Sequence, residues 1–171
     1  VYIRGHRHDY DTWASLGNTG WSYDEVLPYF RLSEHNEHID NAWHGRSGPL
    51  WVSNLRTGNP FQARYLEAAR QAGFPLTDDF NGAEQEGVGI YQVTQKHGER
   101  CSAARAYLLP HTGRRDNLHV QTHAQVQRIL FEGTRAIGVE VLIDGRLQTL
   151  RARREVVLAA GALQTPQLLM L

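Results

Sequence analysis

Closely spaced histidines and aspartates near the start of the chain are the first residues that could do chemistry. His6 and His8 flank one arginine, and Asp9 and Asp11 follow. Binuclear metal hydrolases carry a His-x-His-x-Asp-His pattern, but here Asp11 stands where the third histidine belongs. A second pair, at positions 35 and 38, would share one face of an expected helix end. Neither pair has further ligands at a defined spacing, so we expect solvated surface histidines.

A cysteine and an aspartate-rich turn are the next candidates. Cys101 is the only cysteine, which excludes an intrachain disulfide and a cysteine-based zinc site. It could be a nucleophile near His97, but no local motif supports that role, and a buried or half-buried structural thiol is favoured. The segment Asp78–Gly82 lacks the length and the bidentate glutamate of a calcium loop, which predicts a plain turn.

The strongest local signal lies near the end of the chain. Glu155 to Ala160 is mostly a continuous apolar run, which is typical of a buried parallel strand. Gly161 follows it, and Thr165-Pro166 predicts a helix start with these residues at N-cap and N1. Helix N-termini attract anions and glycine permits a close backbone approach, so this unit is a candidate nucleotide site. The same join also serves purely structural roles, and no Gly-x-Gly-x-x-Gly is present.

These candidates must be positioned by helices and strands, and the first half predicts both. Ser22 and Glu25 form a capping box for a helix that ends near Glu34. Pro28 lies inside this helix and is expected to kink or shorten it. Leu50–Ser53 is expected to be a strand that leaves a glycine-containing loop.

A second helix is predicted from its boundaries. Asn59 is its expected N-cap, Pro60 its first residue and Gly73 its C-terminal stop. Residues with helical spacing form its apolar face: Phe61, Tyr65, Leu66, Ala69 and Ala72. Further along, residues 90–94 predict a strand and residues 102–109 a short helix.

The second half predicts an antiparallel meander. Four strand-like runs cover residues 118–122, 126–131, 137–143 and 147–153. Gly133 and the hairpin dipeptide Asp144-Gly145 separate three of these runs. A meander followed by a strand, a glycine and a helix indicates a mixed α/β (α+β) fold.

Composition narrows the class of protein. The 171 residues carry 18 basic and 18 acidic side chains, a formal net charge of zero that predicts no affinity for nucleic acid. No apolar run is long enough to cross a membrane, so we expect no transmembrane segment and a cytoplasmic location. The chain begins at Val1 without a methionine and ends in an apolar stretch, from which we expect a piece of a longer protein.

The order of short motifs along the whole chain resembles one family, the glucose–methanol–choline (GMC) oxidoreductases, in its bacterial choline-dehydrogenase-like branch. Near the end, Gly161 to Leu169 is similar to the first part of the family's second signature. The other motifs that follow the family order are Val1-Tyr2-Ile3-Arg4-Gly5, Asp9-Tyr10-Asp11, Gly20-Trp21, Leu27-Pro28-Tyr29-Phe30, His44-Gly45, Gly48-Pro49-Leu50, Ala106-Tyr107-Leu108, Asn117-Leu118, Gly138-Val139-Glu140 and Glu155-Val156-Val157-Leu158.

The resemblance implies a flavoprotein. It implies part of an FAD-binding Rossmann-like domain with a β-meander, together with part of a substrate-binding domain. The corresponding division is a flavin-proximal connecting segment at 1–40, part of the substrate-binding domain at 41–98 and part of the FAD-binding domain at 99–171.

The resemblance also implies site residues. Val126, Ala160 and Gly161 match positions on the adenosine side of FAD, and Val1 follows the loop that contacts the flavin. Tyr2 is the matching candidate for substrate contact. Core packing is the alternative role for Val126 and Ala160, and it is the favoured role for Tyr2. No catalytic residue and no metal ligand is assigned, because the family's catalytic base maps outside these residues.

The resemblance implies a segment of an FAD-dependent alcohol oxidoreductase that transfers hydride from a primary alcohol to flavin. The partner is then a small-molecule alcohol. The alternative is a non-enzymatic metal- or ligand-binding module that uses the histidine-rich first half. We also expect self-association through the edge of the 155–160 strand, whose neighbour in the family comes from another segment.

Overall fold

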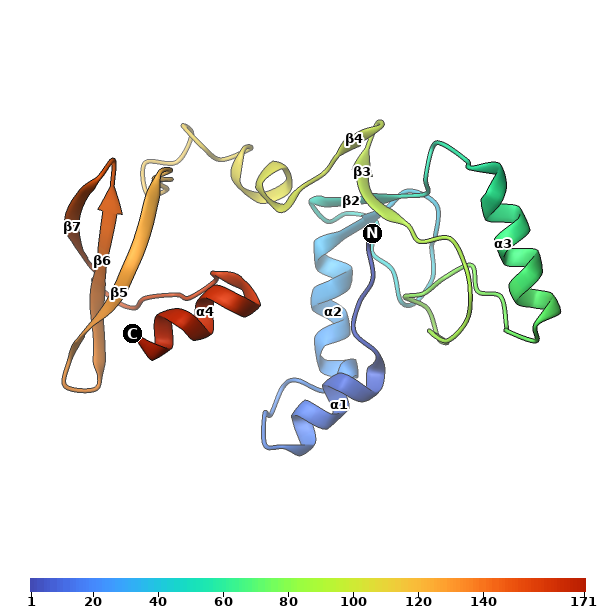
Figure 1. The fold of residues 1–171 in the computed structure, drawn as a ribbon, viewed down its shortest axis with the longest axis horizontal. Coiled ribbons are helices and arrows are strands. Elements are labelled where there is room, and N and C mark those ends of the chain that lie inside the picture. The colour runs from blue at the N-terminus through green and yellow to red at the C-terminus, as the bar shows by residue number, and fades with distance from the viewer. The chain divides into compact units, whose positions relative to one another are not determined.

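The computed structural model describes all residues from Val1 to Leu171 and divides the chain into two compact units (Figure 1). Unit 1 is Val1–Asp116 and unit 2 is Asn117–Leu171. The division coincides with the change in sequence character after Asn117, where the run of predicted strands begins. The finer division at residues 40 and 98 stays a prediction.

Unit 1 begins with two capped helices. Helix α1 (Arg7–Ser15) starts at a capping box in which His6 is the N-cap and Asp9 the N3 residue. Helix α2 (Tyr23–Ser33) starts at the predicted Ser22–Glu25 capping box. It runs through Pro28 to the predicted end near Glu34. The helix therefore tolerates a proline that removes one backbone donor.

A four-stranded sheet follows these helices in unit 1. Its order is β1 (Glu34–Asn36), β2 (Leu50–Ser53), β3 (Val93–Lys96) and β4 (Glu99–Arg100). Strand β2 is confirmed as predicted, and it pairs in parallel with β1 and antiparallel with β3. The strand expected at 90–94 lies three residues later, because only from residue 93 does the chain reach the ladder of β2.

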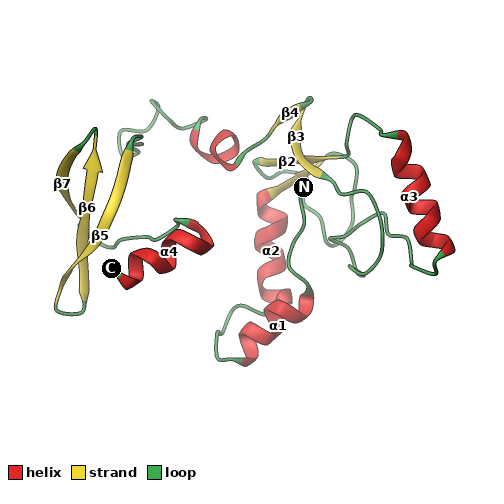
Figure 2. Ribbon diagram, viewed as in Figure 1, coloured by secondary structure: helices red, strands yellow, loops and turns green.

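Helix α3 (Pro60–Gln71) has the predicted boundaries. Asn59 accepts a hydrogen bond from the Phe61 amide, and Gly73 has φ +88° just beyond the C-cap. Figure 2 shows α3 standing apart from α1 and α2. Its aromatic residues Phe61 and Tyr65 are accordingly 69% and 66% exposed. The helix expected at 102–109 is a five-residue π-helix, Ala104–Leu108.

Unit 2 contains the predicted meander. Strands β5 (Ala124–Glu132), β6 (Arg135–Ile143) and β7 (Arg146–Arg151) pair antiparallel in that order. The turn between β6 and β7 has positive φ at both Asp144 and Gly145, as the tight hairpin requires. The strand predicted at 118–122 does not form, since that segment has no ladder partner.

The parallel strand predicted at 155–160 is wrong for this structure. No strand of the chain pairs with this segment, and a β-strand exists only as part of a ladder, so the segment has no regular structure. Helix α4 spans Gly161–Met170, which also corrects the predicted start at Thr165-Pro166. Pro166 lies inside the helix, and Thr165 Oγ1 accepts from the Ala160 amide at 3.1 Å, which ties down the first turn.

The two units together mix helices and strands, as predicted. No helix is both long enough and apolar enough to span a bilayer.

Candidate functional site

Two of the predicted cofactor positions meet in unit 2. The start of strand β5 and one face of helix α4 enclose a cavity of about 430 Å³. Val126 contributes from the strand and Ala160 from the residue before the helix, although 33 residues separate them in sequence. The cavity is lined by Ala124, Gln125, Val126, Gln127, Ala160, Gln164, Gln167, Leu168 and Leu171.

The chemistry of this cavity is neutral. Its side chains are aliphatic or carboxamide, with no Asp, Glu, Lys, Arg or His among them. Strand β5 also has a register shift between Val126 and Arg128, so Gln127 has no Cα partner on β6. Such a bulge frees main-chain groups from the ladder. An apolar wall with carboxamides and free main-chain groups suits a flat neutral heterocycle better than a phosphate.

Gly161, the third predicted residue, does not line the cavity. It is the first residue of α4, is exposed and has φ +88°, a conformation that favours glycine. The helix has no side-chain N-cap, so its first N–H groups lack a side-chain acceptor. The structure therefore brings Val126 and Ala160 together and leaves Gly161 beside them at a helix start.

The remaining predicted residues, Val1 and Tyr2, belong to unit 1. Val1 is 73% exposed, whereas Tyr2 is half-buried. The Tyr2 amide donates to the Gln92 carbonyl at 2.8 Å, and the Tyr2 carbonyl accepts from Asn81 Nδ2 at 3.2 Å. Burial raises the pKa of the Tyr2 phenol, against the opposing effect of nearby Arg4. Both main-chain groups of Tyr2 are thus held by residues far along the sequence, namely the main-chain carbonyl of Gln92 and the side chain of Asn81.

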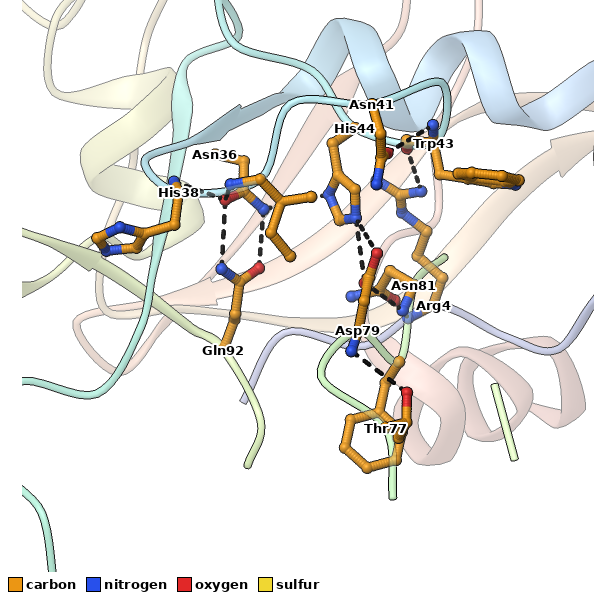
Figure 3. A network of polar contacts seen from close by, with 12 residues as sticks. Arg4, Asn36, His38, Asn41, Trp43, His44, Thr77, Asp79, Asn81 and Gln92 are labelled. Carbon is orange, nitrogen blue, oxygen red and sulfur yellow. Dashed lines mark hydrogen bonds and ion pairs between the residues drawn. The ribbon is translucent and has the colours of Figure 1, made fainter. Parts of the chain in front are cut away.

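Next to this segment lies a buried network of charged and polar groups, of which Figure 3 labels Arg4, His44 and Asp79 with several neutral partners. His44, only 3% exposed, donates from Nδ1 to Glu34 Oε1 at 2.9 Å and from Nε2 to Asp79 Oδ2 at 3.0 Å. Burial by itself lowers the pKa of His44, but the hydrogen bonds to Asp79 and Glu34 outweigh it and raise the pKa to about 9. The ring is therefore an imidazolium at neutral pH.

The two carboxylates respond in the opposite direction. Burial raises the pKa of Glu34, but hydrogen bonds from His44, Asn36 and the Gly45 amide outweigh burial and lower it overall. Burial likewise raises the pKa of Asp79, and the bonds from His44 and the Asn81 amide lower it overall. Both groups are consequently ionised at neutral pH.

Arg4 completes the charge balance. Its guanidinium donates to Glu34 Oε2 at 2.6 Å and to the Trp43 carbonyl at 2.7 Å. Its amide donates to Asn81 Oδ1 at 2.8 Å, which joins the arginine to the turn that carries Asp79. Two cations and two carboxylates therefore share one buried cluster without excess charge, as burial of ionised groups requires.

Sequence reasoning missed this cluster. In the sequence, His44 belongs only to a motif of the family order, and Asp79 only to a predicted turn. Their separations from Glu34, 10 and 45 residues, follow no helical or strand period. The sequence signal at this place is only the glycine that follows His44. The structure explains it, because a Cβ at Gly45 would lie 1.8 Å from the Arg31 carbonyl oxygen, where the chain passes close to another backbone.

Two other histidines and the cysteine have structural positions. His6 caps α1, and His35 stacks on Trp51 with ring centroids 3.7 Å apart. His35 lies in strand β1 rather than at the expected helix end. Cys101 is buried, as predicted, and accepts from the Trp51 amide at 3.4 Å. No group of three His, Cys, Asp or Glu side chains has the arrangement of a metal site, so the geometry does not support the metal-binding alternative.

Known proteins are similar to this chain along its whole length. Choline dehydrogenase, mitochondrial, from Mus musculus is 48% identical over all 171 residues, which cover 28% of that protein. Oxygen-dependent choline dehydrogenase from Rhizobium johnstonii is 44% identical, again over the whole chain and 31% of the relative. The chain thus spans about three-tenths of the length of these relatives.

Solved structures share the fold. An FAD-dependent oxidoreductase from Chaetomium thermophilum matches with a TM-score of 0.89 and 32% identity over 99% of this chain and 32% of that one. Pyridoxine 4-oxidase from Mesorbium loti gives the same score and identity over 99% of this chain and 33% of that one. The family model described as GMC oxidoreductase matches residues 1–171. The chain therefore belongs to the GMC oxidoreductase family.

Proposed function

We propose that this chain is a segment of an FAD-dependent alcohol oxidoreductase of the choline-dehydrogenase type. The whole enzyme would oxidise a small primary alcohol, and FAD, when bound, would accept the hydride. Family membership over all 171 residues and the names of the relatives support this reaction class. The observation that carries the proposal for this chain is the meeting of Val126 and Ala160 in one neutral cavity.

We assign that cavity to the adenine of FAD. The half-buried Val126 side chain offers an apolar wall, and Gln164 and Gln167 offer amide donors and acceptors. The bulge at Gln127 offers main-chain groups that could read the edge of the base. Since the cavity has no cation, the pyrophosphate would be held elsewhere, and Gly161 at the start of α4 would lie on the adenosine side.

In unit 1 we assign Val1 and Tyr2 to the flavin and substrate side. Their role would be to shape the surface against which the ring and the alcohol lie. No residue of this chain is proposed as the base that takes the hydroxyl proton, which the resemblance places outside these 171 residues. We therefore expect the chain alone to bind FAD weakly or not at all, and to oxidise neither choline nor simple alcohols.

The adenine assignment can be tested by titrating the chain with adenosine monophosphate while recording NMR spectra. Shifts are expected at Val126, Ala160 and their neighbours, with a Kd of about 1 mM or weaker because the adenine contacts act alone. Val126→Arg should abolish the shifts. Val120→Arg, a matched change at a 50% exposed valine outside the cavity, should preserve them.

Shifts that map elsewhere, or that survive Val126→Arg, would refute the adenine site. Stoichiometric yellow FAD on the purified chain would show that the phosphate site lies within it. Alcohol oxidation that survives replacement of every histidine would contradict the absence of the base from this segment.

A further inference from the structure

The buried charge cluster of unit 1 is not needed by any chemistry proposed above, yet it joins four separate stretches of chain. Arg4 comes from the N-terminal segment, Glu34 from β1, His44 from the following loop and Asp79 from a distant turn. The side chains of Arg4, Glu34 and His44 are each at most 2% exposed. Removing these charged groups from water has a large desolvation cost. Only well-aligned hydrogen bonds and ion pairs offset this cost, so the members are held to a narrow geometry.

Geometry by itself defines the protonation of the central ring. Carboxylates only accept hydrogen bonds, and His44 faces Glu34 Oε1 with one ring nitrogen and Asp79 with the other. With both carboxyl groups ionised, each ring nitrogen has to donate, so both carry a proton. The nearby Asn36 Nδ2 does not compete, because its two hydrogens are directed to Glu34 Oε1 at 2.9 Å and to Gln92 Oε1 at 2.8 Å.

Two short routes lead from the ring to Tyr2. On one side, Asp79 Oδ1 accepts from the Asn81 amide at 2.9 Å, and Asn81 Nδ2 donates to the Tyr2 carbonyl. On the other side, Glu34 Oε1 accepts from both His44 Nδ1 and Asn36 Nδ2. Asn36 bonds to the Gln92 side chain in both directions, and the Gln92 carbonyl accepts from the Tyr2 amide. Figure 3 shows Asn36–Gln92 and Asp79–Asn81 flanking His44.

We propose that His44 is a positioning residue. Held between Glu34 and Asp79, its ring fixes the backbone of the Val1–Tyr2 segment, which lies just before Arg4 in the sequence. That segment, Val1–Tyr2, is the one assigned above to the flavin, so the catalytic relevance of the inference rests on the proposed function. The ring touches neither the flavin nor the alcohol in this assignment. It acts through Asn81 and Gln92, which hold the two main-chain groups of Tyr2.

Loss of the ring proton leaves two carboxylates and one cation in the cluster. The charged groups around the ring are Glu34, Asp79 and Arg4, together with Arg31, whose Nε donates to the His44 carbonyl at 3.3 Å. An unprotonated ring nitrogen would face a carboxylate oxygen, lone pair against lone pair. The turn that carries Asp79 and Asn81 should then shift, and Tyr2 should shift with it.

The first experiment follows the whole 171-residue chain by carbon-detected NMR as pH rises. The ring of His44 should show both nitrogens protonated at neutral pH, and the carbonyl carbon of Tyr2 should titrate with the same midpoint. Asp79→Asn keeps an acceptor but removes the charge, so both midpoints should fall together by about one pH unit or more. Asp24→Asn, at an exposed pair with Arg7, is the matched control and should move neither midpoint.

A purely structural role would change folding without making Tyr2 follow the ring. If His44 titrates while the Tyr2 carbonyl does not, or if only one midpoint moves in Asp79→Asn, the positioning role is refuted and the proposed function is untouched. A neutral His44 at pH 7 would likewise refute it.

The second experiment separates the two proposals. In the complete polypeptide that carries this segment, the flavin absorption spectrum and reduction potential are compared between wild type, Asp79→Asn and Asp24→Asn. If the flavin spectrum or reduction potential changes in Asp79→Asn but not in Asp24→Asn, the result supports positioning at the flavin. A Tyr2 carbonyl that follows the ring while the flavin is unchanged would instead refute the assignment of Val1–Tyr2 to the flavin.

Discussion

The two units are stabilised in opposite ways. Unit 1 buries seven polar or charged residues, among them Arg4, Glu34 and His44, and joins segments up to 81 residues apart by hydrogen bonds. In unit 2, Val141 is the only buried side chain, and the sheet is built from consecutive strands joined by tight turns. Unit 1 therefore depends on long-range electrostatic pairing, whereas unit 2 depends on local turn geometry.

The largest effect is expected for Glu34→Ala. This change leaves Arg4 and His44 as buried cations without their shared partner, which should lower the free energy of unfolding by about 3–5 kcal/mol. Urea denaturation followed by far-ultraviolet circular dichroism measures the loss in either unit, whereas all four tryptophans lie in unit 1.

The matched control lies in unit 2, where Glu140 forms an ion pair with Arg128, a side chain 57% exposed. Glu140→Ala should cost less than about 1 kcal/mol, because water solvates the remaining arginine. Equal losses for Glu34→Ala and Glu140→Ala would contradict the proposed contrast.

The stability of unit 1 should also depend on pH. His44 has a pKa of about 9 in the folded chain against 6.5 for a free histidine, so folding favours its protonated form. This contribution, up to about 3 kcal/mol, is complete below pH 6.5 and is lost as pH rises through about 9. Glu34 and Asp79 have lowered pKa values, so their contribution is lost in acid instead.

The free energy of unfolding should therefore pass through a maximum between the acid and alkaline limbs. Denaturation curves from pH 4 to 10 test this expectation. His44→Gln should remove most of the decrease in the free energy of unfolding at alkaline pH. If the decrease persists in that variant, a group other than His44 causes it.

A smaller effect is expected at the hairpin of unit 2. Gly145 has φ +77°, and alanine in this left-handed conformation costs about 1–2 kcal/mol. Gly145→Ala should reduce protection of the amides paired between β6 and β7 in hydrogen exchange. Gly58→Ala is the matched control, since its φ is not positive and an added Cβ there meets open space. Its effect should be near zero or slightly stabilising.

The smallest effect concerns self-association through residues 155–160. These residues form no ladder, and Val157 is 75% exposed, so the segment is available to pair with another chain. Val157→Lys should weaken association by about tenfold, the value of one lost apolar contact. Gln148→Lys, on exposed β7, should have less effect. Monomers in sedimentation, with strongly protected amides at 156–159, would contradict this prediction.

The sequence by itself determined the locally encoded features. The Ser22–Glu25 capping box, the Asn59-Pro60 helix start and the Asp144-Gly145 turn were all predicted correctly, because their partners lie within about four residues of each other. Local hydrogen bonds and φ preferences decide such features without help from the rest of the chain. Family membership was also recognisable, since motif order survives in the sequence.

The tertiary structure decided everything that depends on distant partners. Residues 155–160 have the apolar character of a strand but lack a neighbour to pair with, and β1 forms because β2 lies beside it. In the sequence His44 has the features of an ordinary loop residue. Only in the folded chain do its two ring nitrogens contact Glu34 and Asp79. Residue type defines what a side chain can do, but a ladder, a cavity or an ion-pair cluster requires contacts that no local spacing encodes.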